Sequence, residues 1–214
     1  MSLGEIVSGF LLSTDPSVTF ALGKLEFSVD TFRVDYEGYR EIGRKIRSGG
    51  IAVSVASRSA GSTTAAVYTP QRDRISVQSD LDLNGRSTRS IIQQAMIVHE
   101  CTHALMDFHR FQTTGLVQEA TAYIAGQVYA AAKTIQLRSG SDPETAAILN
   151  AAFAVVSNRA MTRTTAQRLS TGDPDIMALM NAIHAHRDYR SSHQTVSVDG
   201  ISGGLINPWY EPRH

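Results

Sequence analysis

The 214-residue sequence contains a single cysteine, Cys101, and therefore cannot form an intramolecular disulfide. A chain without disulfides fits a reducing compartment. Long apolar runs are also missing, since none approaches the roughly 20 residues that cross a bilayer as a helix. The apolar stretch 6–12 is short, is interrupted by Ser8 and Gly9, and has no basic residue before it. We therefore expect no signal peptide and no membrane segment, and a cytoplasmic location or export without a cleaved signal.

The sequence has no excess of either charge, because 20 Lys and Arg residues balance 20 Asp and Glu residues. Without a basic surface, neither nucleic acid nor an anionic membrane is an expected partner. The hydrophobic fraction of 42% is ordinary for a globular protein. A chain of this length can bury a core without metal or disulfide cross-links. A metal ion would therefore serve chemistry rather than hold the fold together.

We find no internal repeat and no low-complexity linker, and we interpret residues 1–214 as one domain. It would have a mixed N-terminal segment at 1–48 and an irregular C-terminal tail at 190–214. Alternating apolar residues predict strands at 51–57, 65–69 and 74–78. Two close antiparallel connections are the simplest way to pair them, with a turn at 58–63.

Helical patterns cover most of the remaining chain. Asp142-Pro143 and Asp173-Pro174 mark two helix starts, because proline suits the first turn. We expect helices at about 36–46, 88–109, 116–136, 143–158 and 174–188, and a short strand at 195–198. A small antiparallel sheet followed by a helical bundle predicts an α+β fold.

The helix expected at 88–109 carries His99-Glu100-Cys101-Thr102-His103, an HExxH motif. Residues four apart lie one above the other on a helix, so His99 and His103 can ligate one ion. Glu100 lies roughly 100° around the helix, too far to be a third ligand. It is close enough to reach a water in the open position of a catalytic zinc site.

The two histidines interrupt an otherwise apolar stripe on this helix, formed by Ile92, Met96, His99, His103 and Met106. We therefore expect them to face the core rather than solvent. Buried neutral imidazoles need hydrogen-bond partners or a ligand. One metal ion would satisfy both histidines.

A catalytic zinc needs a third protein ligand, and Glu119 on the next helix is the preferred candidate. It shares a helix face with Leu116, Ala120, Tyr123, Ile124 and Gln127. An ionised carboxylate on such a face is costly unless it is paired or metal-bound. If the two helices pack antiparallel, Glu119 points back towards His103. The alternative is a capping acid near a helix start, where the helix dipole favours it.

Two further candidates for the third ligand are weaker. His109 would complete the spacing HExxHxxxxxH of metzincins, but Met106 stands where those proteins have a glycine that turns the chain back. Asp107 is one turn past His103 and fits better as a supporting or capping acid. We interpret both as residues of a solvated helix end. Cys101 points away from His99 and is expected to pack in the core.

The segments 97–105 and 117–123 resemble the paired active-site helices of gluzincin metallopeptidases. The resemblance implies zinc as the cofactor, His99, His103 and Glu119 as its ligands, and Glu100 as the general base. It also implies a sheet before the metal helix. The interval to Glu119 is shorter than in thermolysin-like members, which puts membership of that subfamily in doubt.

These features together predict a zinc-dependent metallopeptidase acting on a peptide or protein substrate. A free strand edge by the metal helix could hold an extended peptide. Two alternatives remain open, a degenerate zincin that only binds a partner and a zinc hydrolase of a non-peptide amide. An oxyanion donor is required as well, and the available residues are Tyr123, His184, His186, Tyr189, His193 and Tyr210. Of these, Tyr123 is expected to orient a ligand, while His184 and His186 are expected at the surface. The sequence does not indicate an oligomeric state.

Overall fold

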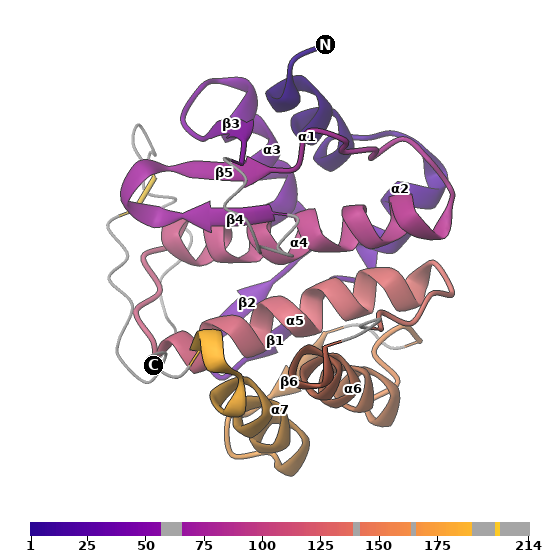
Figure 1. The fold of residues 1–214 in the computed structure, drawn as a ribbon, viewed down its shortest axis with the longest axis vertical. Coiled ribbons are helices and arrows are strands. Elements are labelled where there is room, and N and C mark those ends of the chain that lie inside the picture. Colours follow the sequence, from indigo (N-terminus) through magenta and orange to yellow (C-terminus); the bar gives the residue numbers. More distant parts are fainter. Residues whose placement is uncertain (57–65, 139–141, 164–165, 190–199, 202–214) are drawn as a thin grey trace.

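The computed structural model describes residues 1–56, 66–138, 142–163, 166–189 and 200–201. Over these residues the chain forms seven α-helices and two three-stranded sheets, an α+β fold (Figure 1). The turn predicted at 58–63 and the strand predicted at 195–198 lie outside the described residues, as do His193 and Tyr210.

The N-terminal segment folds into regular elements, of which the sequence pattern predicted only the helix at 36–46. It contains α1 (Leu3–Leu11), α2 (Pro16–Gly23), β1 (Phe27–Val29), β2 (Phe32–Val34) and α3 (Tyr36–Arg47). Ser2 and Glu5 form a capping box at the start of α1, and Asp15 accepts a hydrogen bond from Ser17 N at the start of α2. Val7, Leu22 and Tyr39 are fully buried, so this segment is part of the core.

The three predicted strands are confirmed as β3 (Ala52–Val55), β4 (Ala66–Thr69) and β5 (Arg74–Val77). The expected pairing is partly wrong. β4 pairs antiparallel with β5, but β3 pairs with β5 in parallel, and the order is β3-β5-β4. Ile75 and Val77 are fully buried, which suits β5 as the central strand. One edge of β4 is therefore left to face the helix that follows.

A second sheet, in the order β2-β1-β6, was not predicted. Its third strand, β6 (Gln167–Leu169), pairs in parallel with β1, so Phe27 lies opposite Gln167. Phe27, Val29 and Leu169 are buried in this sheet, which ties the N-terminal third of the chain to its C-terminal third.

The two longest helices, α4 (Thr88–Phe108) and α5 (Gly115–Ala132), lie side by side (Figure 1). Ser87 and Thr114 cap them through hydrogen bonds from Ser90 N and Val117 N. A side chain at Gly126 of α5 would meet the carbonyl oxygen of Ala95 at 3.1 Å, so glycine allows the helices to approach closely. Residues near 119 and 126 contact residues near 103 and 95 respectively, which confirms the antiparallel arrangement.

The remaining helices, α6 (Pro143–Asn158) and α7 (Pro174–Ala185), cover the side of α5 away from the β3-β5-β4 sheet (Figure 1). Asp142 caps α6 through the backbone N–H groups of Glu144 and Thr145. The last predicted helix is shorter than expected, since α7 ends at Ala185 and a 3-10 turn, η2 (Arg187–Tyr189), follows it. A second 3-10 turn, η1 (Pro70–Arg72), joins β4 to β5.

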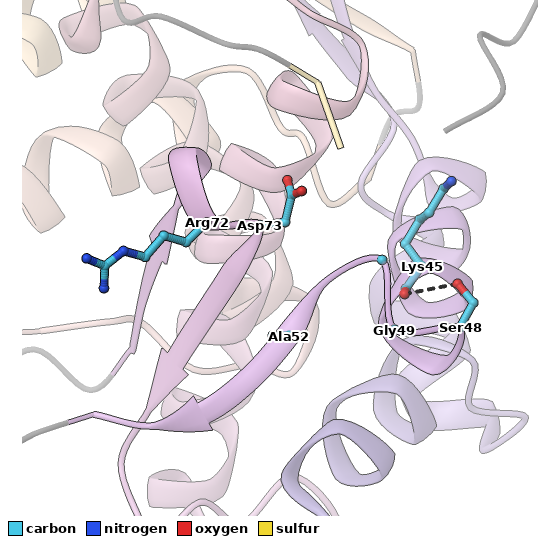
Figure 2. Close-up of a pocket in the computed structure, with 7 residues that line it drawn as sticks. Lys45, Ser48, Gly49, Ala52, Arg72 and Asp73 are labelled. Carbon is cyan, nitrogen blue, oxygen red and sulfur yellow. Dashed lines mark hydrogen bonds between the residues drawn. The ribbon is translucent and has the colours of Figure 1, made fainter. Parts of the chain in front are cut away.

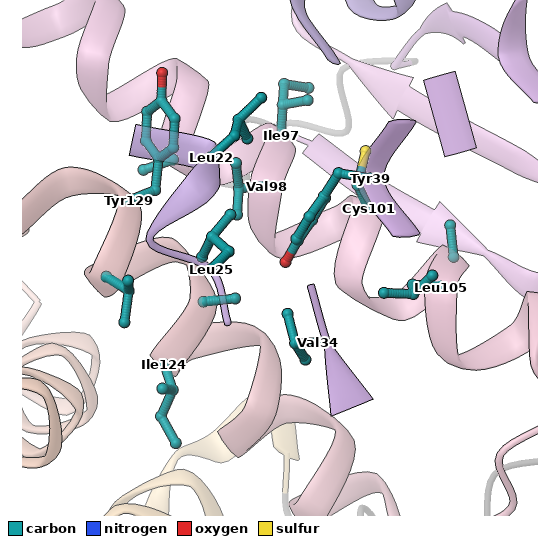
Figure 3. Close-up of a cluster of buried hydrophobic side chains, with 14 of the residues drawn as sticks. Leu22, Leu25, Val34, Tyr39, Ile97, Val98, Cys101, Leu105, Ile124 and Tyr129 are labelled. Carbon is teal, nitrogen blue, oxygen red and sulfur yellow. The ribbon is translucent and has the colours of Figure 1, made fainter. Parts of the chain in front are cut away.

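Side chains from many elements share one core. Figure 3 shows Leu22 of α2, Val34 of β2, Tyr39 of α3, Cys101 of α4 and Ile124 of α5 in this cluster. Within the described ranges, no single helix is long and apolar enough to cross a membrane, although α1 and α2, bent by 69° at their junction, pass that test as a pair.

Candidate metal centre

The structure brings together the three residues that the sequence analysis proposed as metal ligands. His99 and His103 lie one turn apart on α4, and Glu119 faces them from the first turns of α5. Their ligand atoms all lie within 4.8 Å of one another. Each of the three side chains is less than one-fifth exposed, so the cluster is sheltered but can still be reached from solvent.

The distances within the cluster fit a single zinc ion. The Nε2 atoms of His99 and His103 are 3.3 Å apart. His99 Nε2 lies 3.5 Å from Oε2 of Glu119, and His103 Nε2 lies 3.5 Å from Oε1. A tetrahedral ion with bonds of about 2.0–2.1 Å separates its ligand atoms by about 3.3–3.4 Å. The two imidazole nitrogens already have this spacing, and Glu119 offers one oxygen to each of them.

The charge of Glu119 also fits a cation at this place. Its Oε2 atom is buried and has no hydrogen-bond partner among the described residues. Burial alone would raise the pKa of this carboxyl, but His103 and His99 outweigh it and hold the pKa well below the usual range. Glu119 is thus ionised at neutral pH. A buried carboxylate oxygen without a donor is costly unless a positive charge compensates it.

Glu100 lies beside the cluster rather than in it, as the sequence predicted. Its Oε1 atom is 4.0 Å from His99 Nε2, while its Oε2 atom accepts a hydrogen bond of 2.6 Å from Tyr68 N on β4. Burial raises the pKa of Glu100, and Glu119 adds to this, while the two histidines oppose it. A carboxylate with a raised pKa is a better proton acceptor.

Tyr68 is a site residue that the sequence analysis did not identify. Its backbone N–H points away from β5, at the free edge of β4, and holds the carboxylate of Glu100. Its hydroxyl donates to Asp107 Oδ2 at 2.7 Å. No sequence signal predicts the first contact, because any residue except proline supplies a backbone N–H.

The expectation that Asp107 lies at a solvated helix end was wrong. Asp107 is fully buried rather than at a solvated helix end, because Tyr68 and Gly200 satisfy its oxygens. Gly200 N donates to Oδ1 at 3.0 Å. Asp107 therefore joins α4 to β4 and to the chain at 200–201. It supports the centre without belonging to the ligand cluster.

His109 also lies outside the ligand cluster, as expected from the continuing helix. It is the C-cap residue of α4 and packs edge-on against Phe32 and Phe108. These contacts leave it half-buried, and burial lowers the pKa of its imidazole. Cys101 is fully buried, as expected for a packing residue.

Two tyrosines lie beside the ligand cluster, Tyr123 on α5 and Tyr189 in η2. The ring of Tyr123 meets the ring of His99 edge-on, with centroids 4.6 Å apart. The Tyr123 hydroxyl lies 3.0 Å from the hydroxyl of Tyr189 in η2. Among the predicted oxyanion donors, His184 is exposed as expected, but His186 is buried, contrary to expectation, because it packs under η2.

A surface pocket lies elsewhere, between the end of α3 and the β4–β5 turn (Figure 2). It is lined by Lys45, Ser48, Gly49, Gly50, Ala52, Arg72 and Asp73. The carbonyl of Lys45 accepts hydrogen bonds from the Ser48 hydroxyl and from Gly50 N, which serve to end α3. The pocket contains no histidine, and none of the ligand-cluster residues line it.

Comparison of the chain with models of known protein families, with curated protein sequences and with solved structures gave no match in any of the three. The fold and the site geometry are therefore the grounds on which function is inferred.

Proposed function

We propose that the protein is a zinc-dependent metallopeptidase of a gluzincin-like kind, with His99, His103 and Glu119 holding the ion. The observation that carries the proposal is the triangle of two imidazole nitrogens and one carboxylate oxygen, with Glu100 beside it. Three protein ligands leave room for one exchangeable water, which distinguishes catalytic from structural zinc sites. When bound, the ion would lower the pKa of that water and polarise a substrate carbonyl.

The chain's own residues supply the remaining chemistry. Glu100 takes a proton from the attacking water at Oε1, since Oε2 is occupied by Tyr68 N. It then delivers this proton to the leaving nitrogen. The hydrogen bond from Tyr68 N fixes the carboxylate so that the same oxygen faces the reacting atoms in both steps. The edge of β4 that does not pair with β5 lies next to this carboxylate, and its groups other than Tyr68 N would be the place to align an extended peptide.

The zinc content and the role of Glu100 test this proposal together. Protein expressed with ample zinc should contain about one ion per chain and cleave a pool of fluorescence-quenched peptides. Glu100→Gln should keep the zinc and lose on the order of 100-fold or more in kcat. A Glu100→Gln variant as active as the wild type would contradict the proposed mechanism.

The alternative functions give different results in the same assays. A binding protein with a zincin fold would hold zinc, and neither wild type nor Glu100→Gln would cleave any peptide. A hydrolase of a non-peptide amide would cleave small acyl amides but not the peptide pool. Absence of any bound transition metal after metal-replete expression would exclude all three.

A further inference from the structure

The pocket between the end of α3 and the β4–β5 turn is bordered by more positive than negative charge, although the whole chain has no net charge. Two of its lining residues are cations, Lys45 and Arg72, and one, Asp73, is an acid. Arg47 and Arg74 each adjoin a lining residue in the sequence, and both are exposed. The surface around the pocket is therefore locally basic.

The arginines at this pocket lack the acidic partners that other arginines of the chain have. On α3 itself, Arg44 pairs with Glu41 at 2.8 Å. Within the described residues, Arg47, Arg72 and Arg74 form no ion pair. Exposed side chains change rotamer within nanoseconds. The guanidinium of Arg72 is thus free to turn towards an anion in the pocket.

The shape of the pocket allows a ligand to reach its floor. Its volume is about 570 Å³, within the range of ligand sites. Gly49 has a φ of 82°, and no atom lies within 4 Å of the place where its Cβ would be. The backbone N–H groups of Gly49, Gly50 and Ala52 already donate to carbonyl oxygens. The charged side chains therefore decide which ligand binds.

Lys45 and Arg72 lie on opposite sides of the pocket (Figure 2). The Lys45 ammonium is 5.4 Å from the centre of the Phe108 ring, at the end of α4. A planar guanidinium can bind both oxygens of a carboxylate, and an ammonium adds a point charge. Asp73 would repel a phosphate dianion about twice as strongly as a single carboxylate. A carboxylate is therefore the anion that fits best.

The pocket lies beyond one end of β4, near the candidate metal centre. The turn η1 follows β4 directly and packs against α4 (Figure 1). Tyr68 N on β4 holds Glu100, and Arg72 comes four residues later. Two extended residues and two residues of a 3-10 turn advance the chain by roughly 10 Å. An extended peptide covers that distance in about three residues.

From these observations we propose that the pocket binds the carboxylate of an acidic residue of a peptide substrate, about three residues from the cleaved bond. Arg72 and Lys45 are its cationic partners. The inference rests on the proposed function and names a substrate class for it, peptides with Asp or Glu at that distance. A nucleic acid fits this surface less well, because contacts to successive phosphates need a longer basic surface.

The test uses the zinc-loaded full chain and three peptide pools that differ at one fixed position, which is Glu, Gln or Lys. Mass spectrometry of the products gives the distance of that position from each cleaved bond, and kcat/KM is measured for each pool. Arg72→Gln removes the guanidinium, and Arg72→Glu reverses its charge. Arg168→Gln is the matched control, since Arg168 is exposed on β6 and has no ion pair within the described part of the chain.

We expect the wild type to cleave the Glu pool about tenfold better in kcat/KM than the Gln pool, because a charge-assisted hydrogen bond is added. The preferred bonds should lie about three residues from the Glu, on one side of it only. Arg72→Gln should cleave the Glu and Gln pools equally, and Arg72→Glu should prefer the Lys pool. Arg168→Gln should keep the wild-type preference.

Binding is measured separately, because it does not require cleavage. Zinc-loaded Glu100→Gln is titrated into fluorescein-labelled octapeptides of Ala and Ser that carry one Glu or one Gln. The Glu peptide should bind about tenfold more tightly, and adding Arg72→Gln should remove the difference. If no pool is cleaved and this difference is still found, the peptidase proposal fails and the assignment of the pocket stands.

Two results would overturn the assignment. One is a protein that neither cleaves nor binds Glu peptides in preference to Gln peptides. The other is a preference for Glu that persists in Arg72→Gln, which would place the partner of the acidic residue elsewhere on the protein.

Discussion

At the scale of single residues, the burial of the ionised Glu119 side chain is energetically unfavourable by itself and therefore indicates a cation-binding site. It lies on a helix face that is otherwise apolar, and one of its oxygens is buried without a donor. Such a group destabilises a fold unless its charge is compensated. Histidine rings alone give partial compensation, because an imidazole must be protonated to carry a positive charge. A divalent ion would compensate Glu119 and leave both imidazoles neutral.

Substitutions distinguish Glu119 from His109 as the third zinc ligand. Glu119→Gln should lower zinc affinity by about 100-fold or more, because a neutral amide replaces an ionised ligand. His109→Gln, the matched control, should leave zinc affinity within about threefold of the wild type, since its ring packs on Phe32 and Phe108. Competition with a fluorescent chelator measures both. Retained zinc in the Glu119 variant would show that the ligand set is wrong.

Substitution of Tyr68 distinguishes the structural role of its hydroxyl, which bonds to Asp107, from the role of its backbone N–H, which holds Glu100. Tyr68→Phe removes the hydrogen bond to the buried Asp107 carboxylate and should destabilise the fold by about 1.5–3 kcal/mol. It keeps the backbone N–H on Glu100, so zinc content and kcat should change little. Tyr39→Phe, which loses a hydrogen bond to the neutral Thr102 hydroxyl, should cost only about 1 kcal/mol. Urea unfolding gives both values, and equal losses would contradict this account of Asp107.

Residue types and spacing predicted the ligand cluster because each member carries its own signal. His99 and His103 occupy adjacent turns of one helix, and Glu119 is a charge on an apolar face. Asp107 and His186 were misjudged because their partners come from distant parts of the chain. Asp107 is buried by β4 and residue 200, and His186 by the start of α6. Neither contact leaves a local pattern in the sequence.

At the scale of elements, the centre depends on how closely α4 and α5 approach. Gly126 sits where a side chain would meet the backbone of Ala95, and His99 is next to it. Gly126→Val should destabilise the fold by about 2 kcal/mol and weaken zinc binding, because the helices must separate. Gly9→Ala in α1, where no atom lies within 4 Å, should instead stabilise by about 0.5–1 kcal/mol. Thermal unfolding with and without zinc measures both effects. A Gly126→Val variant of unchanged zinc affinity would contradict the close-packing argument.

Elements with strong periodicity were predicted well, and those without it were not. Strands β3, β4 and β5 and helices α3 to α6 lie close to their predicted ranges. The pairing of β3 was wrong, because alternation identifies a strand but not its neighbour. Helices α1 and α2 were missed, although Ser2 with Glu5 and the pair Asp15-Pro16 are the same kinds of start signal that mark α6 and α7. Three-residue strands such as β1, β2 and β6 are too short for any periodicity.

At the scale of the whole molecule, the apolar core is extensive without the metal ligands. The largest fully buried side chains, such as Tyr39, Phe27 and Ile97, belong to one apolar cluster that includes none of the three ligand residues. Chelation of zinc should therefore leave the helical circular dichroism signal and the protection of the Cys101 thiol unchanged. Zinc at about 1,000 times its Kd should raise stability by about 4 kcal/mol and the Tm by on the order of 10 °C. Loss of helical signal on chelation would show that the metal holds the fold.

The pairing of β1 with β6 has a consequence for the order in which the protein folds. The two strands are 140 residues apart, from Phe27 to Gln167, and closing so long a loop is slow compared with forming helices. During synthesis on the ribosome, β1 cannot pair with β6 until residue 169 has emerged. Helices α4 and α5, adjacent in sequence and joined by a short turn, can pair long before that. We therefore expect the nascent chain to acquire its zinc ligands, and the capacity to take up the ion, before the sheet that closes the domain exists.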